Sequence, residues 1–148
     1  MANKRISELT VATQPLTLSD VLPIVQSSGS RKVAVKDLSK VGYQDIITDA
    51  TTTRQFALAD VGCWIRSTSA SAITDTIPAN ATVPFPIGQM LNGIQAAAGQ
   101  ITFTPAGGVT INKPAGYNAK TRAQGSAFCL IKIATDVWDL VGDLEATV

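Results

Sequence analysis

From Tyr43 to the C-terminus, short apolar runs alternate with turn residues, and no amphipathic stretch is long enough for more than a turn or two of helix. Thr, Val and Ile, which favour strands, are frequent in the runs, and Gly, Pro and Asn fill the intervals. The pattern predicts strands over residues 45–48, 54–58, 63–68, 72–77, 87–94, 101–105, 109–112, 126–133 and 137–144. Because no crossover helices are present to support a parallel α/β fold, we predict an all-β fold, an antiparallel, jelly-roll-like β-sandwich or barrel.

The first 40 residues differ from the rest of the chain in their pattern of apolar and polar positions. The segment "PIVQ" leads through the turn-forming "SSGS" into "KVAVKDL", in which apolar and polar residues alternate. This order predicts a small β-hairpin within an extended N-terminal arm. A single hairpin is barely stable in water, so it needs another surface to dock on. We therefore predict two parts, an arm with its hairpin over residues 1–40 and a β knob over residues 41–148.

The last two apolar runs predict which side chains face the core. In "AFCLIKI", Lys132 is taken to mark the outer face, so the residues at 129, 131 and 133 should point inward. Phe128 and Leu130 then share the side of Lys132 and are candidates for a subunit interface. In "VWDLVGDL", Asp139 marks the outer face and directs Trp138 and Leu140 to the core.

Composition adds an expectation about association. Charged residues make up 16% of the chain, against about 25% in an average soluble domain, while hydrophobic residues reach 45%. At 148 residues the chain is long enough for a substantial core, yet so few charges leave apolar surface uncovered. We therefore expect a homo-oligomer, in which copies cover part of one another's surface.

Charge and hydropathy exclude other partners. A net charge of +1 creates no global field that would attract nucleic acid. No apolar run approaches the roughly 20 residues needed to cross a bilayer. The N-terminal "MANKRISELT" has no apolar segment typical of a secretory signal, so synthesis in the cytosol is expected.

The residues that usually carry chemistry are scarce. Without any histidine, Ser-His-Asp and Cys-His catalysis is excluded. Asp136, Asp139 and Asp143 are close in sequence, but on a strand the last two would lie about 13 Å apart, too far for a glycosidase pair. Cys63 and Cys129 are expected to be buried free thiols, because two cysteines make neither a disulfide framework nor a zinc site. We predict no catalytic residue, no cofactor site and no metal site.

Two stretches resemble surface proteins of tailed bacteriophages. "KRISELTVATQPLTLSDVLPIVQSSGSRKVAVKDL" resembles the N-terminal module of fibre and head-fibre proteins. "ALADVGCWIRSTSASAITDTIPANATVPFPIGQ", "GQITFTPAGGVTIN" and "IKIATDVWDLVGDL" resemble, in that order, a small β domain of the same proteins. The N-terminal module's recurring positions are occupied by Ile6, Leu9, Asp20, Leu22, Pro23, Val25 and Leu38.

The resemblance implies a structural role in a homotrimer, with no catalytic residues to carry over. It implies that residues 1–40 attach the protein to a capsid or tail protein of the particle. The expected anchoring residues are Ile6, Leu9, Leu22, Ile24 and Val33. No coiled-coil, triple-helix or β-helix period for a fibre shaft is evident, which favours a capsid decoration protein or short head fibre on the virion surface.

Two other functions stay open at this point. The first is a small tail-fibre or receptor-binding subunit that recognises a host surface polysaccharide, with Tyr117 and Asn118 in the longest predicted loop as candidate contacts. The second is a carbohydrate-active enzyme that works with carboxylates alone. The only glutamates available to it are Glu8 and Glu145, both near the ends of the chain.

Overall fold

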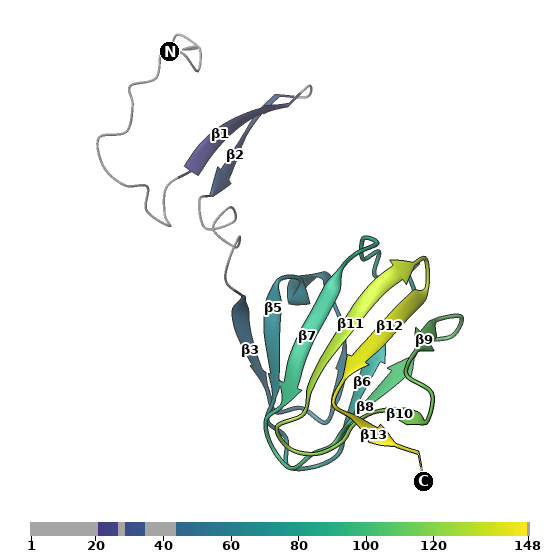
Figure 1. Ribbon diagram of the computed structural model, residues 1–148. Coiled ribbons are helices and arrows are strands. Elements are labelled where there is room, and N and C mark those ends of the chain that lie inside the picture. Colours follow the sequence, from purple (N-terminus) through teal and green to yellow (C-terminus); the bar gives the residue numbers. More distant parts are fainter. Residues whose placement is uncertain (1–20, 27–28, 35–43, 148) are drawn as a thin grey trace. The chain divides into compact units, whose positions relative to one another are not determined.

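The computed structural model describes residues 21–26, 29–34 and 44–147 (Figure 1). The chain divides into two units between Tyr43 and Gln44, close to the boundary predicted from the sequence. The first unit contains β1 (Val21–Gln26) and β2 (Gly29–Ala34), which pair antiparallel where the sequence predicts a hairpin.

The register of the hairpin relates three of the predicted anchoring positions. Leu22 lies directly opposite Val33, and Ile24 follows two residues along the same strand. Positions two apart on a strand, and positions opposite each other on paired strands, share a face. Leu22, Ile24 and Val33 therefore occupy one face of the ribbon, whereas Ile6 and Leu9 lie outside the described residues.

The second unit consists of two layers of β-sheet (Figure 1). The six-stranded sheet contains, in spatial order, β3 (Asp45–Asp49), β5 (Cys63–Ser67), β7 (Met90–Gln95), β11 (Ala127–Ala134), β12 (Val137–Gly142) and β9 (Thr110–Asn112). The five-stranded sheet contains β13 (Leu144–Ala146), β10 (Tyr117–Thr121), β8 (Ile101–Pro105), β6 (Ile73–Ile77) and β4 (Thr53–Gln55). A short 3₁₀ helix, Leu58–Asp60, follows β4. The all-β prediction is confirmed, and the two layers are consistent with a β-sandwich.

The strand pairing is mixed, which corrects the prediction of an antiparallel sandwich. From β3 to β8 the chain changes sheet at every step, so β3, β5 and β7 pair parallel in one sheet and β4, β6 and β8 pair parallel in the other. β9 also pairs parallel with β12, while the remaining pairs of the two sheets are antiparallel. Parallel neighbours need a crossover of about a dozen residues, and here a strand of the facing sheet supplies it in place of a helix.

The sequence shows no repeat over the segment from β3 to β8, in which the chain alternates between the sheets, because the connections between its strands differ in length. The connection from β4 to β5 covers residues 56–62, whereas the connection from β6 to β7 covers residues 78–89. The segment from β3 to β8 therefore coils between two sheets without the constant repeat by which a β-helix is recognised in a sequence.

The inward and outward faces of β11 are the reverse of those predicted. Phe128 and Leu130 are 3% and 0% exposed and belong to the core, so they are not available for a subunit interface. Lys132 shares their side and is 2% exposed, whereas Ile133 points outward and is 44% exposed. The lysine is buried because its Nζ donates hydrogen bonds to Asn80 Oδ1 and, at 2.7 Å, to the backbone oxygen of Phe85. A charged residue was therefore a misleading marker of the outer face.

The core between the sheets follows the alternation of the other strands. Trp138 and Leu140 are each 1% exposed, which confirms their predicted inward orientation. The ring of Trp138 meets that of Phe85 edge-on at 5.5 Å. The buried apolar cluster consists of Phe56, Ile65, Ile73, Ile77, Phe85, Leu91, Ile101, Phe103, Val109, Phe128, Leu130, Trp138, Leu140 and Leu144.

Gly93 on β7 leaves room for the Phe128 ring between neighbouring strands of the six-stranded sheet. A Cβ at this position would lie 2.5 Å from the backbone oxygen of Ile65 and 2.7 Å from Cζ of Phe128. The ring of Phe128 therefore occupies the space that a side chain at 93 would need. That ring packs against Phe103 of the facing sheet with centroids 4.8 Å apart, so the glycine permits a contact between the layers.

The strand β10 was missed, because its segment reads as a polar loop. Thr121, at its end, is fully buried, donates a hydrogen bond from Oγ1 to Gln95 Oε1 at 2.6 Å and accepts one from the backbone N–H of Ile101 at 2.9 Å. These bonds satisfy the polar groups inside the sandwich and tie β10 to β7 and β8. Sequence alternation could not reveal this strand because its buried end is a threonine.

Both cysteines are free thiols, as predicted. Cys63 is buried, and Cys129 is half-buried on the outer side of β11. Within the described residues, no helix has the length and apolar character needed to span a membrane.

Candidate functional site

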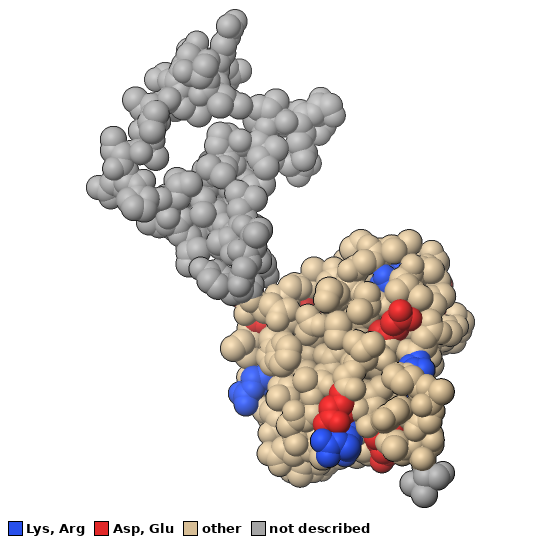
Figure 2. Space-filling model, viewed as in Figure 1, with Lys and Arg blue, Asp and Glu red and all other residues tan. Residues whose placement is uncertain are grey.

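The outer face of the six-stranded sheet is mainly aliphatic. Because inward positions alternate with outward ones, the core residues of each strand identify the outward positions between them. Figure 2, viewed as in Figure 1, shows a largely uncharged surface with scattered charged groups. The apolar residues at outward positions are Ile46, Trp64, Met90, Ile94, Ala127, Cys129, Ile131, Ile133, Val137 and Val141.

Several of these side chains are exposed to a degree unusual for their type. Ile46 is 67% exposed, Met90 is 48% exposed and Val141 is 44% exposed. The charged residues at outward positions of the same face are Arg66 and Asp139, and Asp139 accepts a hydrogen bond from Asn112 at 2.9 Å. A contiguous apolar face of this kind on a sandwich marks a surface that another molecule covers.

The outer face of the five-stranded sheet is polar and rich in threonine. Strand register places Thr53, Thr74 and Thr102 side by side in one row, which Lys120 continues on β10. A second row contains Gln55, Thr76 and Thr104. Threonine combines a high strand propensity with a hydroxyl group that water can solvate. This face therefore needs no partner to cover it.

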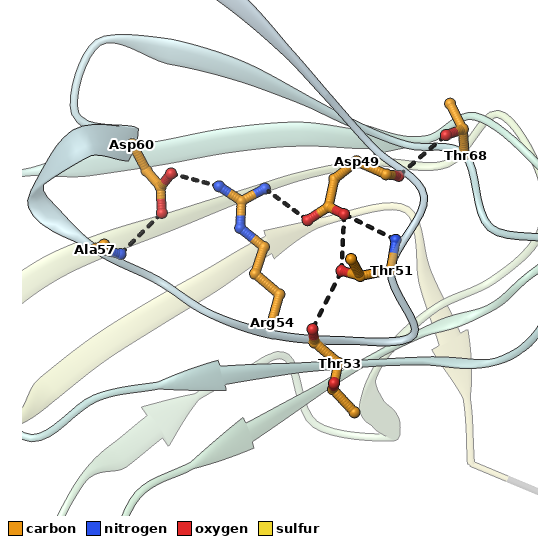
Figure 3. A network of polar contacts seen from close by, with 7 residues as sticks. All are labelled: Asp49, Thr51, Thr53, Arg54, Ala57, Asp60 and Thr68. Carbon is orange, nitrogen blue, oxygen red and sulfur yellow. Dashed lines mark hydrogen bonds and ion pairs between the residues drawn. The ribbon is translucent and has the colours of Figure 1, made fainter.

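A cluster of ionic side chains lies at the β4 edge of the sandwich (Figure 3). Arg54 donates from Nη2 to Asp60 Oδ1, and its Nη1 lies 3.5 Å from Asp49 Oδ2, an ion-pair distance without a hydrogen bond. The other oxygen of Asp60 accepts from the backbone N–H of Ala57 at 2.8 Å, and Asp49 accepts from the N–H and hydroxyl of Thr51. The guanidinium also lies 5.7 Å from the centre of the Phe56 ring. These bonds join β3, β4 and the 3₁₀ helix.

Asp75 extends this cluster into the space between the sheets. Asp75 on β6 lies opposite Arg54 of β4 in the strand register and is 1% exposed. Neither of its carboxylate oxygens has a hydrogen-bond partner. Burial raises the pKa of Asp75 to about 6; Arg54 opposes the shift, whereas Asp49 and Asp60 add to it. A raised pKa is a property of catalytic acids, but a carboxyl group this deeply enclosed is not accessible to a substrate.

The three acidic residues singled out in the sequence do not converge. Asp136 Oδ1 accepts from the backbone N–H of Asn80 at 2.6 Å, and Asp139 is bonded to Asn112. Asp143 accepts two hydrogen bonds from Arg122, at 2.7 and 2.8 Å, and the bonds from Arg122 and Ser126 lower its pKa. Each carboxylate thus has its own partner, and no pair shares a site.

Tyr117 and Asn118 do not lie at a loop tip. Both belong to β10, with Tyr117 40% exposed and Asn118 half-buried. Asn118 Nδ2 donates to Glu145 Oε2 at 2.9 Å, and Gln100 donates to the other oxygen of Glu145 at 3.1 Å. The bonds from Gln100 and Asn118 lower the pKa of Glu145, with a smaller contribution from Lys120. The glutamate that the enzymatic alternative would use is therefore held in a polar lattice on the outer face of the five-stranded sheet.

The hollows formed by residues 44–147 that can be described are open to solvent. The largest hollow described here, about 540 Å³, is open to solvent and lies where β5 and β7 begin. Its lining residues are Gln44, Gly62, Pro86, Ile87, Gly88, Gln89, Met90 and Asn92. In the part of the chain that the structure describes, no group of three or more Cys, Asp or Glu side chains is placed to hold a metal ion. The hollow therefore lacks the enclosure and converging polar groups of a ligand pocket.

The aliphatic outer face was the feature that sequence reasoning missed. The signal was present in "CWIRS" and "MLNGIQ", where both alternating positions carry apolar residues. Alternation separates the two faces of a strand but does not say which apolar set is inside. Comparisons with known protein families, with curated proteins and with solved structures find no match to this chain.

Proposed function

We propose that this chain is a non-enzymatic structural protein of a tailed-bacteriophage virion. In this proposal it is a homotrimeric capsid decoration protein or short head fibre, attached to the particle by its N-terminal arm. The observation that carries the proposal is the correspondence between the two resembling stretches and the two units of the chain. The first stretch contains the β1–β2 hairpin, and the second belongs to the sandwich that begins at Gln44.

The use of the acidic side chains is consistent with an architectural role. Asp136, Asp139, Asp143 and Glu145 each make structural hydrogen bonds, which hold loops and neighbouring strands together. The buried carboxyl of Asp75 is closed off from solvent. None of these groups is free to serve as an acid or nucleophile toward an external substrate.

Attachment through the hairpin has a matched test. Ile24→Asp places a charge on the ribbon face that also includes Leu22 and Val33, whereas Val25→Asp places the same charge on the opposite face. We expect virions grown with Ile24→Asp to lose the protein and virions grown with Val25→Asp to retain it, as measured by quantitative mass spectrometry of purified particles. Equal incorporation of both variants would contradict attachment through this face.

The position on the particle is tested by cryo-EM of the virion. We expect density for the sandwich on the capsid surface, and its loss from particles that lack the gene. Density on the tail alone would reject the capsid position and favour the alternative of a tail-fibre subunit.

The alternative function, recognition of a host surface polysaccharide, is favoured by the threonine-rich outer face. Hydroxyl and amide groups in registered rows, with Asn118 on the neighbouring strand β10, provide hydrogen-bonding groups for sugars. If this function holds, the protein binds host polysaccharide on a glycan array and Tyr117→Ala weakens that binding. Absence of binding to polysaccharide from a permissive host would count against it.

A further inference from the structure

We infer that copies of this chain meet through the outer face of the six-stranded sheet. The inference rests on the oligomeric part of the proposed function and identifies the surface that carries it. Phe128 and Leu130, the interface candidates from the sequence, lie in the core, so the interface must use other residues. The available apolar side chains are those that alternate with the core positions on β3, β5, β7, β11 and β12.

Most of the apolar positions of the central strands line up in a row that crosses the sheet and is interrupted only by Asn92. Register places Ile46 beside Trp64, Trp64 beside Asn92, Asn92 beside Cys129, and Cys129 beside Val141. Four of these five side chains are apolar, and the row crosses five adjacent strands. A partner that covered the row would remove Ile46 and Val141, which are 67% and 44% exposed, from water. Removal of apolar surface from water is the main favourable term in protein association.

The face supplies a substantial area for contact between copies. Six strands about 4.8 Å apart and roughly 20 Å long present about 600 Å² on one side. Stable interfaces bury about 800 Å² per partner, and specific ones begin at about 600 Å². In a cyclic trimer each copy has two neighbours, so each contact uses about half of this area, about 300 Å² per partner, and side chains at the edges of the face supply the remainder.

The chemistry of the face favours a second copy of this chain as the occupant. Its two charged residues have opposite signs and lie toward opposite edges, Arg66 on β5 and Asp139 on β12, so the β3 side of one copy can meet the β9 side of the next with complementary charge. Aliphatic side chains offer a sugar few hydrogen bonds, and one arginine is too little positive charge for a nucleic acid. The low proportion of charged residues in the whole chain agrees with a surface that is covered by its own copies.

Rotational symmetry links this contact to the arm. β3, β5 and β7 run in the same direction, and Gln44 precedes β3 at an edge of the sheet. In a trimer whose axis runs along these strands, the β3 side of one copy contacts the β9 side of the next, and every Gln44 lies at the same end. The three arms then leave the assembly at one pole, as attachment to a single surface requires.

Lysine substitutions on the two outer faces test the inference. Val141→Lys and Ile133→Lys place a charge on the aliphatic face, and Thr74→Lys places the same charge on the threonine-rich face. We expect the full-length wild type and Thr74→Lys to be trimers by analytical ultracentrifugation. The two aliphatic-face variants should dissociate, with a dissociation constant raised about a hundredfold or more, because an unpaired charge would be buried.

The outcomes separate this inference from the proposed function. If the aliphatic-face variants stay trimeric, the copies meet elsewhere and the inference fails, while the proposed trimer stands. If Thr74→Lys alone dissociates, the threonine-rich face is the interface and the inference also fails. A wild type that is monomeric at every concentration overturns both this inference and the proposed trimer. The face would then be covered by a different virion protein or left in water.

Cys129 supplies a second measurement that does not depend on substitutions. Its thiol lies within the row, between Asn92 and Val141, whereas Cys63 is buried in the sandwich. We expect maleimide to label Cys129 slowly at concentrations where the trimer persists and faster after dilution below its dissociation constant. Circular dichroism confirms that the diluted protein remains folded. A labelling rate independent of concentration across the dissociation range would overturn the inference.

Discussion

The two sheets of the sandwich share one core but have opposite outer faces. The six-stranded sheet presents Ile46, Met90 and Val141 outward, while the five-stranded sheet presents registered rows that include Thr74 and Thr104. Both faces consist of strand-forming residues, so strand propensity alone does not distinguish them. The difference shows that only one of the two faces is suited to remain in water.

The inner faces differ as well, because each sheet buries an ionisable residue in a different way. Lys132 behind the six-stranded sheet is bonded to Asn80 and Phe85 and lies 5.9 Å from the centre of the Trp138 ring. Asp75 behind the five-stranded sheet has no hydrogen-bond partner for either oxygen. A buried polar group stabilises a fold only when it is satisfied. The two residues should therefore respond to removal in opposite ways.

The largest effect is expected from Lys132→Met, which keeps a similar volume. The substitution leaves two buried acceptors, Asn80 Oδ1 and the Phe85 oxygen, without a donor. We expect the free energy of unfolding to fall by about 4 kcal/mol. Urea denaturation followed by Trp fluorescence measures it. A loss below about 1 kcal/mol would show that these bonds contribute little.

The second-largest effect is expected on the pH dependence of stability, through the buried carboxyl group of Asp75. Its pKa is raised from 3.8 to about 6 in the folded protein, so the folded state holds the proton more tightly than the unfolded state. The contribution of Asp75 to the free energy of unfolding is therefore fully present below pH 3.8 and is lost as the pH rises through about 6. The total loss is about 3 kcal/mol.

Asp75→Asn isolates this contribution because it cannot titrate. Between pH 3.5 and pH 7, we expect the wild type to lose about 3 kcal/mol of unfolding free energy relative to Asp75→Asn. Other carboxylates, such as Asp143 with its lowered pKa, cancel in the difference. Parallel stability curves for the two proteins would contradict the shifted pKa.

A smaller effect is expected at Gly93, where the Phe128 ring packs over β7. Gly93→Ala would place a Cβ against the Ile65 backbone and the Phe128 ring, and such overpacking costs about 2 kcal/mol. Gly107→Ala is the matched control, because a Cβ there meets nothing within 4 Å. Thermal unfolding of both variants measures the contrast. Equal melting temperatures would show that the Phe128 ring and the Ile65 backbone can accommodate a Cβ at position 93 at no cost.

The smallest effect is expected on the threonine-rich face. Thr104→Ala removes an exposed hydroxyl group and a methyl group that no other layer covers. We expect the free energy of unfolding to change by less than about 0.5 kcal/mol, measured by urea denaturation. A loss of several kcal/mol would mean that this face is covered, and the distinction between the two outer faces would fail.

Much of the fold was predictable because local patterns determine it. The strands β6, β8 and β11 lie where short apolar runs stand between turn residues, and the inward orientation of Trp138 follows from alternation. The strand β10 was not predictable, because Thr121 becomes a core residue only through bonds to Gln95 and Ile101, which lie on other strands.

The candidate site was less predictable than the fold. The prediction for β11 failed because Lys132 was treated as a solvent-facing residue, and the error reversed the assignment of Phe128 and Ile133. Only the segment around Asn80 and Phe85, distant in sequence, makes burial of the lysine favourable. The positions of Tyr117 and Asn118 changed for a similar reason, because β13 provides the partner that makes their segment a strand.

By itself, the sequence determined that this chain forms many short strands and that charged residues make up a small share of it, 16%. Those properties depend on near neighbours and on composition. The tertiary structure decided which strands run parallel, which face of each sheet turns inward, and that the aliphatic surface gathers on one sheet. The physical reason is that a strand has two nearly equivalent faces and two open edges, and only its partners in space determine how each is used.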